Sequence, residues 1–426
     1  CYIVGFMGKA QVNPLVYIII VCVFVLRGFL TASARVLEVG QGYPFSSINE
    51  AVRKAAPYDE IRVFGGRIYR EHVVINKSLT ITGKGWPVVD GCYKTHVIEV
   101  RASNVTISGL KVMHSNRSSR LDYAGIFAQN VSNVKIVNNI LKDNMFSVML
   151  QQTSLCAVEH NQVESNITEN ATMGSGIHCW KGFGLRVTDN KVGHHRDGIY
   201  LEFCEHSYIA RNTIDGCERY GLHFMFSHYN TYMHNVFCHN RAGVAVMYTH
   251  NVTMLKNVFE DNQGTSSYGL LIKELQYARI QGNIFRRNTV GLMIDGGQDL
   301  LVKRNEIRDC GWGVRLVSGS SNDTIVRNNF IGNTFDMATN KSYNGNVVES
   351  NYWDKYDGYE KEHNGVGDVP YRPLSLFASL AEQNTDALLF FRSFLMNLLE
   401  QTEKIIPTVT PDTYQDHSPR LRRWAI

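Results

Sequence analysis

Residues 209–214, Ile-Ala-Arg-Asn-Thr-Ile, carry a pattern that recurs along most of the chain. An apolar residue is followed three positions later by asparagine, and a second apolar residue follows two positions after that. Because self-similarity at a near-constant period marks a repeat architecture, each copy predicts one coil of a solenoid. We expect the asparagines to stack, each amide bonding its copy in the next coil, and the row comprises Asn139, Asn161, Asn190, Asn212, Asn235, Asn257, Asn283, Asn305, Asn329 and Asn351.

Each coil also holds a glycine followed by alternating side chains, as in Gly198-Ile199-Tyr200-Leu201 and Gly221-Leu222-His223-Phe224. Alternation with period two predicts a strand that buries one face and exposes the other. A coil of about 22 residues with two or three such strands suits a parallel β-helix, whose coils lie ~4.8 Å apart. The predicted fold class is therefore all-β, a parallel β-helix over residues 61–373.

Capping segments are expected at both ends of this solenoid. Residues 35–60 should form an N-terminal cap, with a helix near 46–55 in which Ser47 is the N-cap and Glu50 completes a capping box. Residues 374–407 form a C-terminal amphipathic segment, in which the apolar spacing becomes helical over 385–404. That helix either docks on a membrane partner or lies flat as a cap, and residues 408–426 form a loose basic tail.

The first 34 residues have the features of a signal peptide: Lys9, the apolar run Leu15 to Leu26, and the small residues Ala32-Ser33-Ala34. A signal anchor is the alternative, although the run is short for a hydrocarbon core of ~30 Å. The seven cysteines that follow are an odd number without paired spacing, which argues against a disulfide framework. The net charge of +4 comes without a basic and aromatic patch, so nucleic acid is not an expected partner.

One spacing predicts a metal site. Met-x-x-His occurs in two consecutive coils, as Met225 with His228 and Met247 with His250, and His206 lies a further 22 residues upstream. Stacked coils bring like side chains within reach of one ion, and thioether with imidazole prefers Cu(I) to hard cations. His223, on the same strand face as Met225, is a further candidate nitrogen. The alternative is that the histidines are stacked turn residues and the methionines pack under a loop. Because Cys217 matches an inward position, it and its neighbours Cys204 and Cys238 are left out of the site.

An oxygen-rich loop near the C-terminal end offers a second candidate cation site. Asp354, Asp357 and Asp368 alternate there with glycines, a composition that suits calcium. The alternative is that these are ordinary turn residues.

The competing function class is a carbohydrate-active enzyme, such as a lyase, epimerase or glycosidase. Such chemistry needs paired carboxylates, whereas the outward positions of the strands carry Glu202 and Asp295 singly, four coils apart. The segment His194-His195-Arg196-Asp197 beside Glu202 is the one constellation that favours catalysis, and we interpret it as a solvated turn. We therefore predict that the chain is not an enzyme.

Several strings resemble the NosD family: Asp197-Gly198-Ile199-Tyr200-Leu201-Glu202, Arg219-Tyr220-Gly221-Leu222-His223-Phe224, Asn351-Tyr352-Trp353-Asp354 and Gly367-Asp368-Val369-Pro370-Tyr371. The resemblance implies a right-handed, periplasmic β-helix that binds copper and delivers it, with or without sulfur, to the copper centres of nitrous oxide reductase. It further implies an ABC-type permease and ATPase of the inner membrane as partners, with helix 385–404 docking on the permease. The reductase would be reached directly or through a copper chaperone.

Overall fold

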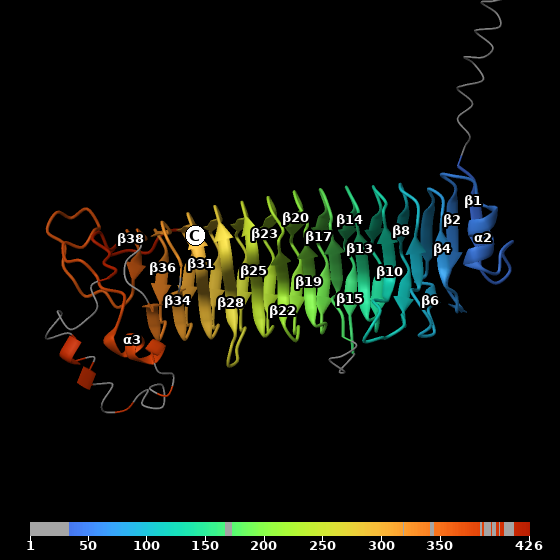
Figure 1. The fold of residues 1–426 in the computed structure, drawn as a ribbon. Helices are drawn as coiled ribbons and strands as arrows, with labels where there is room; N and C mark the ends of the chain where they lie inside the picture. Colours follow the sequence, from blue (N-terminus) through green and yellow to red (C-terminus); the bar gives the residue numbers. More distant parts are fainter. Residues whose placement is uncertain are drawn as a thin grey trace, which may run out of the picture.

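A computed structural model describes residues 34–166, 173–317, 319–340, 345–383, 386, 393, 398–399, 401–403 and 413–426. These residues form a long stack of coils that runs from β1 at one end to β38 and α3 at the other (Figure 1). Each coil contributes one strand to each of three parallel sheets, here called A, B and C. The predicted all-β parallel β-helix is confirmed.

Sheet A contains the strands that precede the asparagine of each coil. Neighbouring strands pair in parallel in chain order, so each coil rests on the one before it. Its strands are β1 (Val36–Val39), β2 (Glu60–Phe64), β5 (Thr80–Lys84), β8 (Thr106–Ser108), β11 (Lys135–Val137), β14 (Ala157–Glu159), β17 (Arg186–Thr188), β20 (Tyr208–Ala210), β23 (Thr231–Met233), β26 (Thr253–Leu255), β29 (Arg279–Gln281), β32 (Leu301–Lys303), β35 (Thr324–Val326) and β38 (Val347–Glu349).

Sheet B contains the short strands that follow the asparagine. Their middle residues point inward, and Phe237, Phe259 and Phe285 stack there at 5.4 and 4.5 Å between ring centroids. The strands are β3 (Ile68–Tyr69), β6 (Val88–Asp90), β9 (Lys111–Met113), β12 (Ile140–Lys142), β15 (Gln162–Glu164), β18 (Lys191–Gly193), β21 (Thr213–Asp215), β24 (Val236–Cys238), β27 (Val258–Glu260), β30 (Ile284–Arg286), β33 (Glu306–Arg308), β36 (Asn329–Ile331) and β39 (Tyr352–Trp353).

Sheet C contains the longest strands, which are the glycine-led runs of the sequence. The glycines pack tightly: a Cβ on Gly221 would lie 2.6 Å from the carbonyl oxygen of Gly243 in the next coil. The strands are β4 (Val73–Ile75), β7 (Ile98–Val100), β10 (Ala124–Gln129), β13 (Phe146–Gln151), β16 (Ile177–Trp180), β19 (Asp197–Glu202), β22 (Tyr220–Met225), β25 (Ala242–His250), β28 (Tyr268–Gln276), β31 (Val290–Gln298), β34 (Trp312–Val317) and β37 (Phe335–Thr339).

The N-terminal end is closed by α2 (Ile48–Lys54), within the predicted helix 46–55. Ser47 is its N-cap and accepts a hydrogen bond from the amide of Glu50, as predicted. The next two amides of the helix, those of Ile48 and Asn49, donate to the carboxylate of Glu71 from the following coil. The solenoid also begins earlier than residue 61, since β1 already pairs with β2 in sheet A.

The asparagine ladder is confirmed with one correction. Asn235 donates from its backbone amide and from Nδ2 to Oδ1 of Asn257, both at 3.0 Å, and the pattern repeats from coil to coil. Near the C-terminal end the rung is Asn328, which accepts from Asn305 and donates to Asn351, whereas Asn329 begins β36. A left-handed backbone conformation occurs at the residue before each rung, as at His234 with a φ of 55°.

The C-terminal end is covered by α3 (Leu376–Gln383) and by residues 413–426. Those last residues are not the predicted loose tail. The buried carboxylate of Asp416 accepts from the amides of Ser350 and Asn351 and from the indole of Trp353, each at 2.9 Å. The final segment therefore closes the last coil through hydrogen bonds to its open backbone edge.

The predicted helix over 385–404 lies mostly outside the described residues. One residue that the structure does describe there, Leu399, packs with Trp312 against a cluster of Phe335, Phe377, Ala378 and Ala381. Of the helices described, none is long and apolar enough to span a membrane. The predicted signal peptide, residues 1–34, falls outside the described residues except for Ala34.

Candidate metal centre

Two histidines meet where sheet C ends in adjacent coils. Met225 and Met247 are register partners in β22 and β25, so the residues three positions later also lie one above the other. The imidazole rings of His228 and His250 stack with centroids 3.9 Å apart and planes 8° from parallel. The repeated Met-x-x-His spacing of the sequence therefore becomes a stacked histidine pair, with two methionines in register three residues earlier in each coil.

Hydrogen bonds hold both rings by the same nitrogen. Nδ1 of His228 lies 3.2 Å from Oγ1 of Thr249 and accepts from the amide of His250 at 3.3 Å. Nδ1 of His250 lies 3.0 Å from Nδ2 of Asn251. Neither Nε2 has a partner within the described part of the chain, so these are the nitrogens that an ion could reach.

Burial favours the neutral, metal-binding form of His228. Burial, followed by the neighbouring His250, lowers the pKa of His228 below its ordinary value. At neutral pH the ring is therefore uncharged, which is the form that binds metals. Both methionines are partly buried, and the hydroxyl of Tyr200 donates to Sδ of Met225 at 3.6 Å.

His206 does not extend the histidine row, although it lies 22 residues before His228. Its ring stacks on Tyr229 at 5.1 Å and 4°. The turn over 216–219 holds one residue more than the turn over 194–196 below it, so Glu202 pairs with Met225 and the coil step here is 23 residues. The predicted stack of His206 with His228 is wrong for this reason.

His223 is also separated from the pair by its surroundings. It is 2% exposed and stacks on Tyr200 at 4.5 Å, and Tyr200 stacks in turn on His178 at 4.8 Å. Burial, followed by the charge of Arg219, lowers the pKa of His223 to about 3. Because Nδ1 already contacts Arg219 at 3.3 Å, this ring belongs to a covered column on sheet C rather than to an open site.

The segment 194–197 is not the solvated turn that we expected. Asp197 is fully buried, with Arg219 Nε at 3.4 Å and Arg196 Nε at 3.6 Å from its carboxylate oxygens. His195 points inward, where its ring lies 3.2 Å from the hydroxyl of Ser147. Sequence reasoning missed this cluster because Arg196 and Arg219, which contact Asp197, lie in the turns before β19 and β22, outside the alternating strand pattern.

Of the three cysteines left out of the predicted copper site, two are buried in the core and the third is not. Cys204 and Cys217 are buried in the core. Cys238 is only partly buried and lies on the outer face of sheet B, where its thiol meets Asp215 and His239. The spacing of the asparagines could have predicted that Asp215 pairs with Cys238, because the two residues are 23 apart and the coil step there is also 23 residues.

The predicted calcium loop does not form a cage. In the described part of the chain, Asp354, Asp357 and Asp368 are not among the groups whose ligand atoms converge within 4.8 Å. Asp354 accepts from the amide of Gly332 and Asp368 from that of Lys361, each at 2.5 Å. These carboxylates therefore act as turn-forming acceptors.

Comparison with known proteins gives two family matches. Residues 163–358 match a family described as "Periplasmic copper-binding protein (NosD)", and residues 87–192 match a right-handed β-helix family. Among solved structures, the Dettilon tailspike protein shares the fold at a TM-score of 0.53, with 12% identity over 64% of this chain and 62% of that one. That likeness concerns architecture alone.

Two curated relatives are similar along most of the chain. Both are described as "Probable ABC transporter binding protein NosD". The protein of Pseudomonas aeruginosa is 26% identical over 83% of this chain and 86% of its own length, and that of Stutzerimonas stutzeri is 26% identical over 83% and 85%. Residues 163–358 thus match the NosD family and residues 87–192 a right-handed β-helix family, in a chain that is similar to two curated NosD proteins over 83% of its length.

Proposed function

We propose that this chain binds copper, as Cu(I), between two coils of the β-helix, through His228, His250, Met225 and Met247. The observation that carries the proposal is the stacked histidine pair, whose Nε2 atoms have no partner among the described residues, three positions after two methionines in register. Imidazole with thioether is a soft ligand set that favours Cu(I). The description of the matching family as copper-binding supports the choice of ion.

The hydrogen bonds around His228 suit such a ligand. To bind through Nε2, the neutral ring must carry its proton on Nδ1. In the structure Nδ1 accepts from the amide of His250, so binding through Nε2 requires the ring proton to move to Nδ1 and that contact to be given up. Thr249 Oγ1 lies within hydrogen-bond distance of Nδ1 and donates its own proton to the carbonyl oxygen of Ser227, so it can accept from the protonated Nδ1. Ligand histidines are commonly oriented in this way by the group behind them.

The finer function that we propose is delivery of copper to the copper centres of nitrous oxide reductase in the periplasm. Delivery would proceed with an ABC-type permease and ATPase, and with the reductase either directly or through a copper chaperone. The descriptions of the two relatives as transporter binding proteins support the transporter partnership. The segment 385–404, with its apolar helical spacing, is the proposed contact with the permease.

Titration of purified residues 35–426 with Cu(I), in competition with a colorimetric chelator, tests the core of this proposal. Replacing Met225, His228, Met247 and His250 together by alanine should abolish binding while leaving the circular dichroism of the β-helix unchanged. Unaltered copper stoichiometry in that variant would remove the site. Loss of co-purification with the permease on deletion of 385–404 would test the docking segment separately.

A carbohydrate-active enzyme is the alternative, and carboxylate spacing weighs against it. Glu202 and Asp295 are four coils apart by strand register, or about 19 Å at ~4.8 Å per coil. Asp197 and Glu202 lie at opposite ends of β19, about 16 Å apart at ~3.3 Å per residue. Paired-carboxylate hydrolysis needs about 5 to 10 Å. Assays with alginate and pectin should therefore give no product.

A further inference from the structure

A second group of metal-binding side chains lies on sheet B, away from the histidine pair. Asp215 ends β21 and Cys238 ends β24, and the two are register partners on the outer face. His239 follows Cys238 at the turn. The carboxylate oxygen, the thiol sulfur and the ring nitrogen all lie within 4.8 Å of one another.

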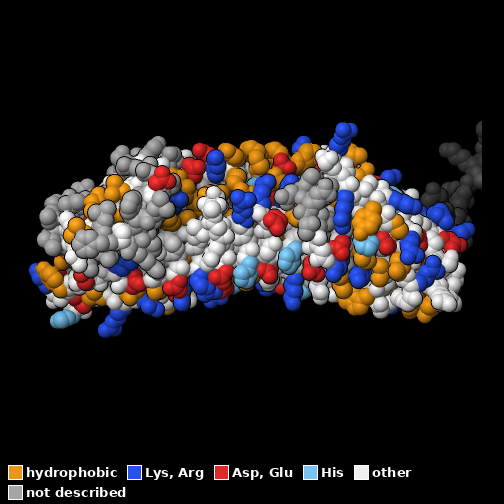
Figure 2. All heavy atoms as spheres, turned by 90° about the horizontal axis from the view of Figure 1, so that it is seen from below, with side chains coloured by type: hydrophobic (Ala, Val, Ile, Leu, Met, Phe, Trp, Pro, Cys, Tyr) orange, Lys and Arg blue, Asp and Glu red, His pale blue; other side chains and the backbone are white. Residues whose placement is uncertain are grey.

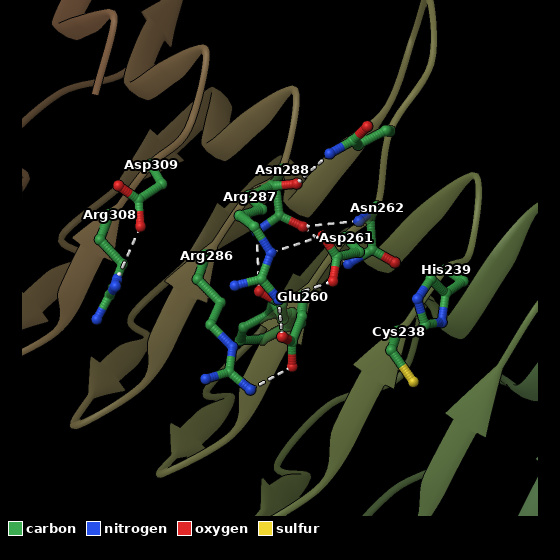
Figure 3. A network of polar contacts seen from close by, with 12 residues as sticks. Cys238, His239, Glu260, Asp261, Asn262, Arg286, Arg287, Asn288, Arg308 and Asp309 are labelled. Carbon is green, nitrogen blue, oxygen red and sulfur yellow. Dashed lines mark hydrogen bonds and ion pairs between the residues drawn. The ribbon is translucent and has the colours of Figure 1, made fainter. Parts of the chain in front are cut away.

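The contacts in this group converge on one oxygen. Nδ1 of His239 lies 2.8 Å from Oδ1 of Asp215, and Sγ of Cys238 lies 3.5 Å from the same oxygen. Three different donor atoms thus meet at one point of the outer surface. Figure 3 shows the Cys238 and His239 side chains beside the acidic and basic residues of the next coils.

In the next coil, the carboxylates at the corresponding outward positions form ion pairs with arginine. Glu260, the register partner of Cys238, pairs with both Arg286 and Arg287, and Asp261 pairs with Arg287 at 2.9 Å (Figure 3). Asp215 is different. Within the described ranges, its carboxylate has no arginine or lysine partner, and its ion-pair contact is His239.

A glycine leaves room beside the group. Gly216 follows Asp215 and has a φ of 64°, and a Cβ built on it would lie 3.2 Å from Nε2 of His194 in the coil below. A larger residue at this position would therefore push the His194 ring aside. Figure 2 shows histidines between acidic and basic side chains on one face of the molecule.

We propose that Asp215, Cys238 and His239 bind a borderline divalent transition-metal ion of the zinc type, with a fourth position open to solvent or to His194. Sulfur with imidazole nitrogen disfavours calcium and magnesium, while the carboxylate disfavours Cu(I) relative to a divalent ion. Three protein ligands with one open position is a coordination that zinc accepts. This site is separate from the Cu(I) site proposed above and does not depend on it.

Binding of the metal ion displaces one proton from the protein and changes no oxidation state. The Cys238 thiol loses its proton to solvent as the sulfur–metal bond forms, and the ring of His239 binds as the neutral imidazole. The two negative charges of thiolate and carboxylate then match the charge of the ion. Burial, followed by the charge of Asp215, raises the pKa of the metal-free thiol to about 12, so the thiol is protonated until an ion arrives.

Cobalt(II) is the probe for the first test, because a cobalt–thiolate bond has its own charge-transfer absorption. The protein is residues 35–426, kept reduced by a phosphine under argon. One equivalent of Co²⁺ should give the thiolate band, Zn²⁺ should remove it, and Cys238→Ser should lack it. Cys92→Ser, at the other partly buried cysteine, is the matched control and should keep it.

The remaining ligands and a second measurement complete the test. Asp215→Asn and His239→Ala should each weaken Co²⁺ binding by at least about tenfold. In the unmodified protein, Zn²⁺ should slow alkylation of Cys238 by iodoacetamide and leave Cys92 unaffected, which checks the site without any variant. A cobalt band that persists in Cys238→Ser, or equal alkylation of Cys238 with and without Zn²⁺, overturns the proposal. The quadruple alanine variant of the Cu(I) site should bind Co²⁺ normally, so the two proposals fail independently.

Discussion

The ring of His228 lies directly over that of His250, 3.9 Å away and 8° from parallel, while His206, at the same sequence spacing, stacks on Tyr229. One residue added to the turn over 216–219 makes this difference. Residues 22 apart in sequence therefore stack only where the step from one coil to the next is also 22 residues. Single-residue changes in turns decide which histidines can share an ion.

This register predicts unequal effects on Cu(I) affinity from two histidines that look equivalent in sequence. His228→Ala should weaken binding strongly, because it removes a proposed ligand. His206→Ala should leave the affinity unchanged, because its ring is paired with Tyr229. Chelator competition measures both, and an equal loss for the two variants would show that our register-based site is misplaced.

Thr249 is predicted to act as a positioning residue for His228. Thr249→Val keeps the shape of this buried side chain but removes the oxygen that can accept from Nδ1. We expect Cu(I) affinity to fall by about 10- to 100-fold. Thr249→Ser should restore it, and Thr253→Val, on the adjacent β26, should have no effect. A merely structural role for Thr249 would lower thermal stability without this pattern of loss and rescue.

Buried histidines should make the fold acid-sensitive. Burial lowers the pKa of His195 to about 4, compared with ~6.5 in an unfolded chain. Between these two pH values the unfolded state binds more protons, so stability is present above pH ~6.5 and is lost as the pH falls towards 4. The loss attributable to this residue is on the order of 3 kcal/mol.

His195→Asn tests that assignment, because neighbouring coils carry asparagine at this position, as at Asn240. Denaturant unfolding gives the free energy of unfolding at pH 7 and at pH 4.5. The decrease in this free energy between the two pH values should be smaller for the variant than for the unmodified chain. His206→Asn, at an exposed ring, should keep the original pH dependence. An unchanged difference in His195→Asn would mean that other groups cause the acid sensitivity.

The ladder correction gives a prediction for two adjacent asparagines. Asn328→Ala removes hydrogen bonds to Asn305, Asn351 and the carbonyl of Val302, all buried, so we expect a loss of about 2–4 kcal/mol of unfolding free energy. Asn329→Ala removes only contacts with Trp424 and should cost about 1 kcal/mol. Chemical denaturation measures the loss of unfolding free energy in both variants. A larger loss for Asn329→Ala than for Asn328→Ala would show that Asn329 is the rung of the ladder.

The C-terminal closure predicts a strong effect of one carboxylate. Asp416→Asn replaces one of the two carboxylate oxygens, which together accept from three N–H donors, by an NH2 group that cannot accept, so we expect about 2 kcal/mol of lost stability. The tryptophan emission should also shift to the red as Trp353 becomes hydrated. Glu164→Gln, at an exposed position of β15 far from this end, is the control and should change neither property.

The sequence by itself determined the repeat architecture. Apolar residues such as Ile209 and Ile214 must face inward in every coil, and Asn212 must satisfy backbone groups that no water reaches, so their spacing records the fold directly. The cap at Ser47 was equally readable, because it depends on neighbours within one turn of helix. The Met-x-x-His pairs were visible for the same reason: adjacent coils of equal length carry like positions into contact.

Only the tertiary structure decided which outward residues meet and which are covered. His206 missed the histidine row because turn lengths add up across coils, and no local pattern reveals the sum. His223 occupies a strand position that alternates outward, yet it is buried. Asp416 reaches the last coil from more than 60 residues away in sequence. Contacts between distant segments depend on how loops fold over the stack, and the periodicity of a strand carries no information about that.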